Sequence, residues 1–160
     1  MTDVQFDSAR FRQVLGHFPT GVCAVTTLAG DEPVGLAIGS FFSASLEPPL
    51  VAFCIGGSSA TWPLIRESGR FCVNVLRDDQ EELSRVFGSK EANKFAGVGW
   101  DRSPLGSPRL SGALAWIDCE IDASHTVGDH EIVVGAVTDL AVNGEGRPLV
   151  FFRGGYAGLA

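Results

Sequence analysis

The amino-acid sequence predicts a mainly β fold: a small antiparallel, Greek-key-like barrel of six or seven strands with peripheral helices. From residue 21 onward, short runs rich in β-branched and aromatic residues are separated by Gly, Pro, Asp and Ser, as in strands joined by turns. Residues 117–123 alternate apolar and acidic side chains with the period of two of a half-buried strand. With 160 residues, 45% of them hydrophobic, the chain has apolar mass for one core, so we expect one domain over residues 1–160.

The first expected element is a short helix near the N-terminus. Ser8 is suited to cap it, and Pro19 ends it. Between these two residues the apolar side chains recur at helical spacing. They are Phe11, Val14, Leu15 and Phe18. Because they share one face, we expect the helix to pack on the main body of the domain.

Four β-type runs and two helices follow. The runs are residues 22–28, 34–38, 50–55 and 71–76. The first helix is predicted over residues 62–67, with Thr61 as a possible cap and Pro63 in the first turn. The second is predicted over residues 79–87, where acidic residues lead and Gly88 ends the helix, in agreement with the helix dipole.

The last third of the chain begins with an irregular segment. Residues 92–112 carry four Gly and two Pro around Trp100 and Leu105 without a clear period, which predicts an ordered surface loop after a brief helical turn. The alternating strand comes next, with Ile117, Cys119, Ile121 and Ala123 facing inward and Asp118, Glu120 and Asp122 facing solvent. A turn at residues 128–130 leads to a strand over 132–142, and a last strand is expected over 149–153.

Charge and hydropathy exclude several classes of partner. With 12 Lys+Arg against 19 Asp+Glu the net charge is −7, so the chain lacks the basic face that a phosphate backbone requires, and we expect no nucleic-acid binding. No apolar run approaches the roughly 20 residues of a membrane span, and the N-terminus lacks the cationic start of a signal peptide. We therefore expect a soluble, cytoplasmic protein without a membrane partner.

The four cysteines are expected to be small buried hydrophobes. Each lies in an apolar run, and no pair has CxxC or Cys/His metal spacing, so no metal site is expected. They are Cys23, Cys54, Cys72 and Cys119.

Two glycine-containing segments are candidates for ligand contact. Residues 55–61 leave a buried strand, turn on two glycines, offer three hydroxyls and enter a helix, an arrangement that can hold a phosphate without a cation. The alternative is an ordinary loop with a Ser/Thr cap. Residues 35–43 form a strand that lacks bulk at alternate positions, where a flat ring can approach the backbone. The alternative there is a strand that ends in a bulge.

None of the three histidines belongs to a nucleophile motif such as GxSxG. His17, at the end of the first helix, fits a structural role, and His125 is expected to be exposed. His130 lies in the tight turn at residues 128–130, from which a side chain can project over the mouth of a barrel. A functional and a purely structural role for His130 both remain open.

Several of these stretches together resemble the short-chain flavin reductase family, whose members adopt an FMN-binding split barrel. The resemblance runs from Phe11 to Tyr156. Its matching pieces are FPTGV at 18–22, SFFSASLEPPLV at 40–51, GRFCVNVL at 69–76, KF at 94–95, GDH at 128–130 and FRGGY at 152–156. Their order and spacing, rather than any single piece, carry the resemblance.

The resemblance implies two groups of binding residues. The flavin contacts fall on Gly35, Leu36, Ala37, Gly39, Ser40, Cys54, Ile55, Gly56, Ala60, Thr61, Val86 and Phe87. The contacts to the nicotinamide nucleotide fall on His130, Arg153, Gly154, Gly155 and Tyr156. Many members have Ala-Asn-Ser where this chain has Ile38, Gly39 and Ser40. Many also place Lys or Arg near the phosphate, whereas residues 56–60 contain neither, so phosphate binding is expected to use hydroxyls and backbone.

The activity implied by the resemblance is NAD(P)H:flavin oxidoreduction, with NADH favoured. The enzyme reduces FAD or FMN by hydride transfer and supplies diffusible reduced flavin to a partner flavin-dependent monooxygenase, with His130 positioning the nicotinamide. A homodimer is also expected, and the mean hydropathy of +0.18 agrees with an extra buried interface. The alternatives are a non-catalytic FMN- or FAD-binding flavoprotein on the same barrel and, less favoured, a relative of pyridoxamine-phosphate oxidase.

Overall fold

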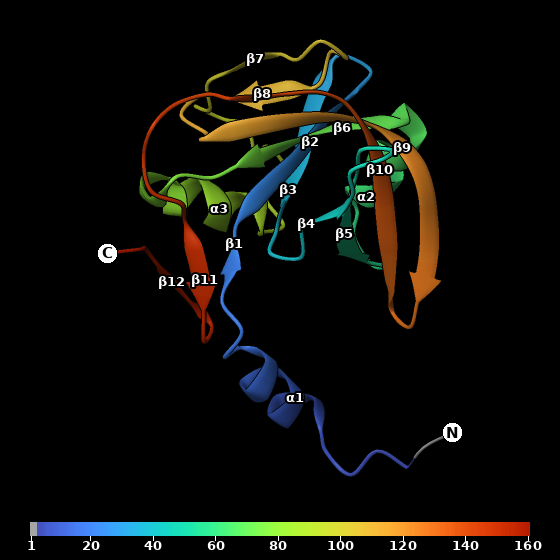
Figure 1. The fold of residues 1–160 in the computed structure, drawn as a ribbon, viewed down its shortest axis with the longest axis vertical. Helices are drawn as coiled ribbons and strands as arrows, with labels where there is room; N and C mark the ends of the chain where they lie inside the picture. The colour runs from blue at the N-terminus through green and yellow to red at the C-terminus, as the bar shows by residue number, and fades with distance from the viewer. Residues whose placement is uncertain (1–2) are drawn as a thin grey trace.

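The computed structural model describes residues 3–160. Seven antiparallel strands form the main sheet in the order β3-β2-β6-β9-β10-β5-β4 (Figure 1). Their bounds are β2 (Cys23–Ala29), β3 (Glu32–Ile38), β4 (Phe42–Ser45), β5 (Leu50–Gly56), β6 (Arg70–Val75), β9 (Ala115–Val127) and β10 (His130–Val142). The Ser40 hydroxyl, just after β3, bonds the main chain of Cys54 in β5 and so connects two strands that are not neighbours in this order. The predicted mainly β barrel with peripheral helices is confirmed.

Smaller elements surround this sheet. Strands β1 (Thr20–Gly21), β11 (Val150–Phe152) and β12 (Gly155–Ala157) form a three-stranded sheet in the order β1-β11-β12. The helices are α1 (Ser8–Leu15), α2 (Trp62–Ser68) and α3 (Glu81–Phe87), the last preceded by the 3-10 turn η1 (Asp78–Gln80). The expected last strand over 149–153 is therefore too long: Arg153 has φ 53° and lies in the turn that leads to β12.

The core consists of two apolar clusters. Inside the barrel, the rings of Phe53 and Phe71 meet edge to face at 5.2 Å, and both are fully buried. Beneath α3, Phe87 packs against Phe95 with ring centroids 5.0 Å apart. Because Phe87 ends α3 and Phe95 lies in the next loop, the second cluster fixes both segments against β2 and β3.

The segment 92–112 is not the loop that the sequence predicts. It contains a short hairpin of β7 (Trp100–Arg102) and β8 (Pro108–Leu110). Asp118 holds the connection between these strands, because its buried carboxylate accepts hydrogen bonds from Ser103 Oγ at 2.8 Å and Leu105 N at 2.7 Å. The expectation that Asp118 faces solvent is therefore wrong: the hairpin covers that part of the otherwise wet face of β9.

The N-terminal helix also differs from expectation. Its N-cap is Asp7 rather than Ser8, since the Asp7 carboxylate accepts from Arg10 N at 2.8 Å. No residue of α1 is buried, and Figure 1 shows the helix standing away from the barrel. The helix therefore does not pack on the main body of its own chain. One tether is the hydrogen bond from Arg153 N to Gly16 O at 2.8 Å.

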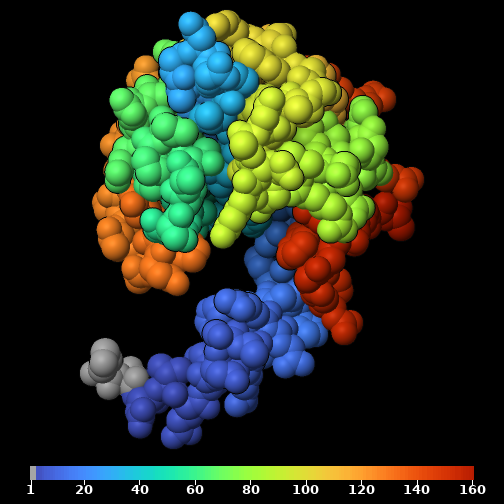
Figure 2. All heavy atoms as spheres, turned by 180° about the vertical axis from the view of Figure 1, so that it is seen from behind, coloured from blue at the N-terminus to red at the C-terminus, as the bar shows by residue number. Residues whose placement is uncertain are grey.

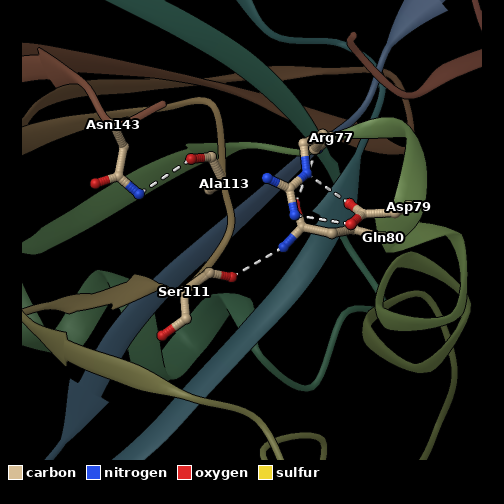
Figure 3. A network of polar contacts seen from close by, with 6 residues as sticks. All are labelled: Arg77, Asp79, Gln80, Ser111, Ala113 and Asn143. Carbon is tan, nitrogen blue, oxygen red and sulfur yellow. Dashed lines mark hydrogen bonds and ion pairs between the residues drawn. The ribbon is translucent and has the colours of Figure 1, made fainter. Parts of the chain in front are cut away.

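A polar network fixes the start of α3 against the segment that leads into β9 (Figure 3). Arg77 donates twice to the Asp79 carboxylate, at 2.8 and 2.7 Å, and its backbone N–H donates to Gln80 Oε1. Gln80 Nε2 in turn donates to Ser111 O at 3.0 Å. Asn143 adds a bond to Ala113 O at 3.1 Å. These bonds orient α3, whose far end forms part of the site described below.

Within residues 3–160, no helix is both long and apolar enough to cross a membrane.

Candidate functional site

A cavity of about 740 Å³ opens where β3, β5, the β5–α2 loop and the end of α3 converge. Figure 2 shows this hollow between the green segment that contains α2 and the yellow-green segment that follows α3. Its lining residues are Leu36, Ala37, Ile38, Gly39, Ser40, Cys54, Ile55, Gly56, Ser58, Ser59, Ala60, Thr61, Phe87, Gly88, Ser89, Lys90, Glu91, Lys94 and His130. The structure thus brings together most of the predicted flavin residues from four separate stretches of the chain.

One wall of the cavity is the end of β3 and the strand opposite it. Ser40 Oγ donates to Cys54 O at 3.0 Å and accepts from Cys54 N at 2.9 Å. These two hydrogen bonds connect the end of β3 to β5 at the cavity wall. Gly39 is small for a local reason, because an added Cβ would lie 2.8 Å from Thr20 Oγ1.

Gly35 and Val86, two of the predicted flavin residues, do not line this cavity. Gly35 is buried, and an added Cβ would meet Val25 O at 2.9 Å and Phe87 at 3.0 Å. Its lack of a side chain therefore serves packing against α3. Val86 faces a separate hollow of about 300 Å³ between α3 and the loop before β7.

The β5–α2 loop supplies hydroxyls to the opposite wall. Ser59 Oγ accepts from the N–H groups of Thr61 and Trp62, at 3.3 and 3.2 Å. Thr61 is the N-cap residue of α2, as expected, but its side chain makes no capping bond, and the Ser59 hydroxyl accepts from the first N–H groups instead. The hydroxyl residues Ser58 and Thr61 line the cavity.

Two cationic side chains that sequence reasoning did not assign to the site also line the cavity. Lys90 and Lys94 lie in the loop after α3, and they are the only lysines in the chain. Lys94 belongs to the KF pair at 94–95, but the sequence offered no sign that this loop folds against β3. Burial lowers the pKa of Lys94.

His130 lies at the rim of the cavity, at the start of β10. Its Nδ1 donates to Asp129 Oδ1 at 2.7 Å, and the interaction with His130 lowers the pKa of Asp129. The side chain is 52% exposed. Because Gly128 turns the chain at φ 60°, the hairpin presents the ring beside Gly56 across the strand pair. One ring nitrogen is thereby oriented by Asp129, and the other remains available to a ligand.

The remaining predicted nicotinamide residues lie on the other side of β3. Tyr156 lines a smaller hollow of about 190 Å³ that shares Ala37, Ile38 and Gly39 with the main cavity. The Tyr156 hydroxyl bonds Ser84 Oγ at 2.8 Å. Arg153 and Gly154 form the β11–β12 turn, Gly155 begins β12, and none of the three lines either hollow.

Three of the four cysteine thiols lie outside the cavity. Cys23 and Cys119 are buried, which raises the pKa of each thiol to about 12, and burial raises the pKa of Cys72 as well. Cys54 is the exception to the predicted burial, since it is half-buried and lines the cavity. Across residues 3–160, no cluster of three His, Cys, Asp or Glu side chains is suited to a metal ion.

These features define a class. An antiparallel barrel whose cavity joins small residues, hydroxyls and lysines is suited to bind a nucleotide cofactor that brings its own chemistry. The chain belongs to the flavin reductase like domain family, whose model matches residues 15–160.

Individual relatives agree with this membership. The chain is 50% identical over 153 residues to "Flavin-dependent monooxygenase, reductase subunit HsaB" of Rhodococcus jostii, covering 96% of this chain and 78% of that protein. Among solved structures, nitrilotriacetate monooxygenase component B from Mycobacterium thermoresistibile superposes with a TM-score of 0.94 at 48% identity, covering 96% and 87% of the two chains. The Streptomyces globisporus NADH:FAD oxidoreductase SgcE6, in complex with NAD and FAD fragments, gives a TM-score of 0.91 at 34% identity, covering 96% and 93%.

Proposed function

We propose that this flavin reductase oxidises NADH, reduces FAD or FMN, and releases the reduced flavin to a separate flavin-dependent monooxygenase. The observation that carries the proposal is the cavity between β3 and the end of α3, which joins a narrow wall of small residues to hydroxyls and lysines. The small residues leave room for a flat flavin ring, and the hydroxyls and lysines suit the phosphate-bearing chain of the flavin. The printed names of HsaB and SgcE6 support the same reaction and the same kind of partner.

The residues of this chain act by binding and orientation. Hydride acceptance is the chemistry that a flavin supplies when bound, and it requires two rings stacked at reacting distance. The backbone groups of Gly39 and Ser40, which line the cavity, would stabilise the negative charge that grows on a bound flavin as it is reduced. We expect His130, oriented by Asp129, to contact the nicotinamide at the cavity rim.

Release of the flavin fits the open character of the site. The half-exposed His130 and the exposed Lys90 border the mouth of the cavity. A reductase component that hands its product to another protein requires such an exit, which a protein that retains its flavin permanently does not need. This comparison favours the reductase over the non-catalytic flavoprotein.

The test is the rate of NADH oxidation in air with FAD, FMN or no added flavin. We expect rapid oxidation only when free flavin is present, and the two rates rank the flavins. Repeating the assay with NADPH ranks the donors. No oxidation with either flavin, together with a yellow purified protein, would contradict the reductase and support the non-catalytic alternative.

We also propose that the protein is a homodimer. The arm formed by residues 3–18 exposes a set of apolar side chains that its own barrel does not cover. They are Val4, Phe6, Phe11, Val14, Leu15 and Phe18. A patch of this kind is typical of an interface, and a second copy offers the same patch in return. The molar mass in solution tests the proposal, and a value near the 16.9 kDa of one chain would contradict it.

A further inference from the structure

The Lys94 ammonium group is held in place by the main chain. Lys94 Nζ donates to Phe87 O at 2.9 Å and to Gly35 O at 3.2 Å. Phe87 ends α3 and Gly35 lies in the middle of β3, so two rigid elements fix the amine. An ammonium group has three N–H donors, and these carbonyls use two of them. The third donor remains for a ligand in the cavity that Lys94 lines.

The charge of Lys94 is not neutralised by a protein carboxylate. No ion pair joins it to Asp or Glu in the described part of the chain. Glu91, which lines the same cavity, is exposed, as is Lys90. Burial without an anionic partner disfavours the charged form of Lys94, which agrees with the lowered pKa. An anionic group of a ligand would complete this environment.

The placement of the lysines indicates which chemical group of the ligand they bind. In a chain of net charge −7, both lysines face one cavity, and none of the ten arginines does. Across that cavity, residues 58–61 offer hydroxyls and main chain without a cation. A phosphoryl group is the part of a flavin nucleotide that carries full negative charge in both redox states. Its oxygens accept charge-assisted hydrogen bonds.

We propose that Lys94 binds the phosphoryl group of the flavin nucleotide, and so supplies from the loop after α3 the cation that residues 56–60 lack. This inference rests on the proposed function and adds a basis for selectivity. The enzyme distinguishes phosphorylated flavins from riboflavin through one preoriented ammonium group. Lys90, exposed at the mouth, contributes weaker, screened attraction.

The test compares the affinities of riboflavin, FMN and FAD, measured by quenching of flavin fluorescence without NADH. We expect Lys94→Gln to weaken FMN and FAD about ten- to hundredfold, the range of a lost charge-assisted hydrogen bond, and to change riboflavin by less than about twofold. Lys94→Arg, which keeps the charge, restores part of the loss. Lys90→Gln is the matched control, with a clearly smaller effect on FMN.

Two results would overturn the inference. One is unchanged FMN affinity in folded Lys94→Gln, and the other is an equal loss for riboflavin and FMN, which would place Lys94 against the ring or in a structural role. Salt dependence of the unmodified protein gives a measurement that needs no variant. FMN affinity is expected to fall between 50 and 500 mM NaCl, about the range in which screening grows strong, while riboflavin affinity stays level; identical behaviour would also refute the role. Failure of the proposed function is distinguishable, because NADH oxidation with added flavin would then be absent whether or not FMN affinity depends on Lys94.

Discussion

Gly135 shows at the scale of one residue how closely the barrel interior is packed. A Cβ added at this position would lie 2.5 Å from Phe71 Cζ and 3.0 Å from Cys119 Cβ. Both neighbours are fully buried, so neither can move into free space. The absence of a side chain in the middle of β10 therefore lets Phe71 fill the core.

The variant Gly135→Ala is expected to lower the free energy of unfolding by about 1 to 3 kcal/mol through overpacking. Urea denaturation followed by tryptophan fluorescence measures the change. Gly144→Ala is the matched control, because nothing lies within 4 Å of the added Cβ and the backbone there is not left-handed. Equal stability of the two variants would show that Phe71 relaxes freely.

His130 and His125 lie on the same hairpin, but only His130 lines the cavity. His130→Ala is expected to raise the KM for NADH by about five- to tenfold, the size of one lost hydrogen bond, with a smaller change in the KM for flavin. His125→Ala, also exposed, serves as the control with both constants unchanged. Steady-state kinetics measure both KM values. An unchanged KM for NADH in His130→Ala would contradict the proposed contact between His130 and the nicotinamide.

At the scale of elements, long strands and turns were predictable from the chain, whereas of the strands of three residues only β11 was. The runs that became β2, β5 and β6 carry their own apolar pattern, so their positions followed from sequence. Strands β7 and β8 have three residues each and depend on distant partners. Leu110 N, for example, donates to the buried Asn74 Oδ1. No local pattern records a bond across 36 residues.

The same distinction applies to the site. Residues 35–43 and 55–61 were predicted as candidates for ligand contact because glycines and hydroxyls mark them along the chain. Lys94 was not assigned a role, because its position depends on Phe87 packing against Phe95, a contact that exists only after α3 has folded onto the barrel. Cavity walls contributed by tertiary packing leave little trace in local sequence.

The attachment of the β7–β8 hairpin to β9 predicts an unusual pH dependence. Burial raises the pKa of Asp118, and this effect exceeds the lowering by its bonds with Leu105 and Ser103; Asp139 adds to the rise and Arg109 opposes it. When the pKa of a carboxyl group is higher in the folded state than in the unfolded state, ionisation of that group favours unfolding. The contribution of Asp118 to the free energy of unfolding is therefore lost as pH rises above about 4.

Comparison with Asp118→Asn isolates this contribution. Between pH 4 and 7, the free energy of unfolding of the unchanged protein is expected to fall relative to that of the variant. Exposed carboxyl groups whose pKa is lowered, such as Asp79 and Asp101, act in the opposite direction but are present in both proteins and cancel. Urea midpoints at four pH values measure the difference. A difference that is level or grows with pH would contradict the assignment.

At the scale of the whole molecule, the structure separates a closed core from an open arm. The barrel buries its aromatic residues in two clusters, whereas α1 buries none, and Figure 2 shows the blue arm projecting from the body. A helix of eight residues is too short to be stable in water by itself. The arm therefore requires a surface to pack on, and the barrel of its own chain does not provide it.

The final prediction concerns this arm and the proposed dimer. Val14 and Leu15 are 59% and 53% exposed in the single chain. If the dimer covers them, charged side chains introduced at these positions would be buried without a partner and would oppose association. The double variant Val14→Asp/Leu15→Asp is expected to be a monomer by light scattering, whereas Gln13→Asp, on the same helix, remains a dimer. Because association stabilises the folded state by mass action, the Tm of the unchanged protein should rise with protein concentration, and that of the double variant should not. A dimer that survives the double substitution would place the interface elsewhere on the barrel.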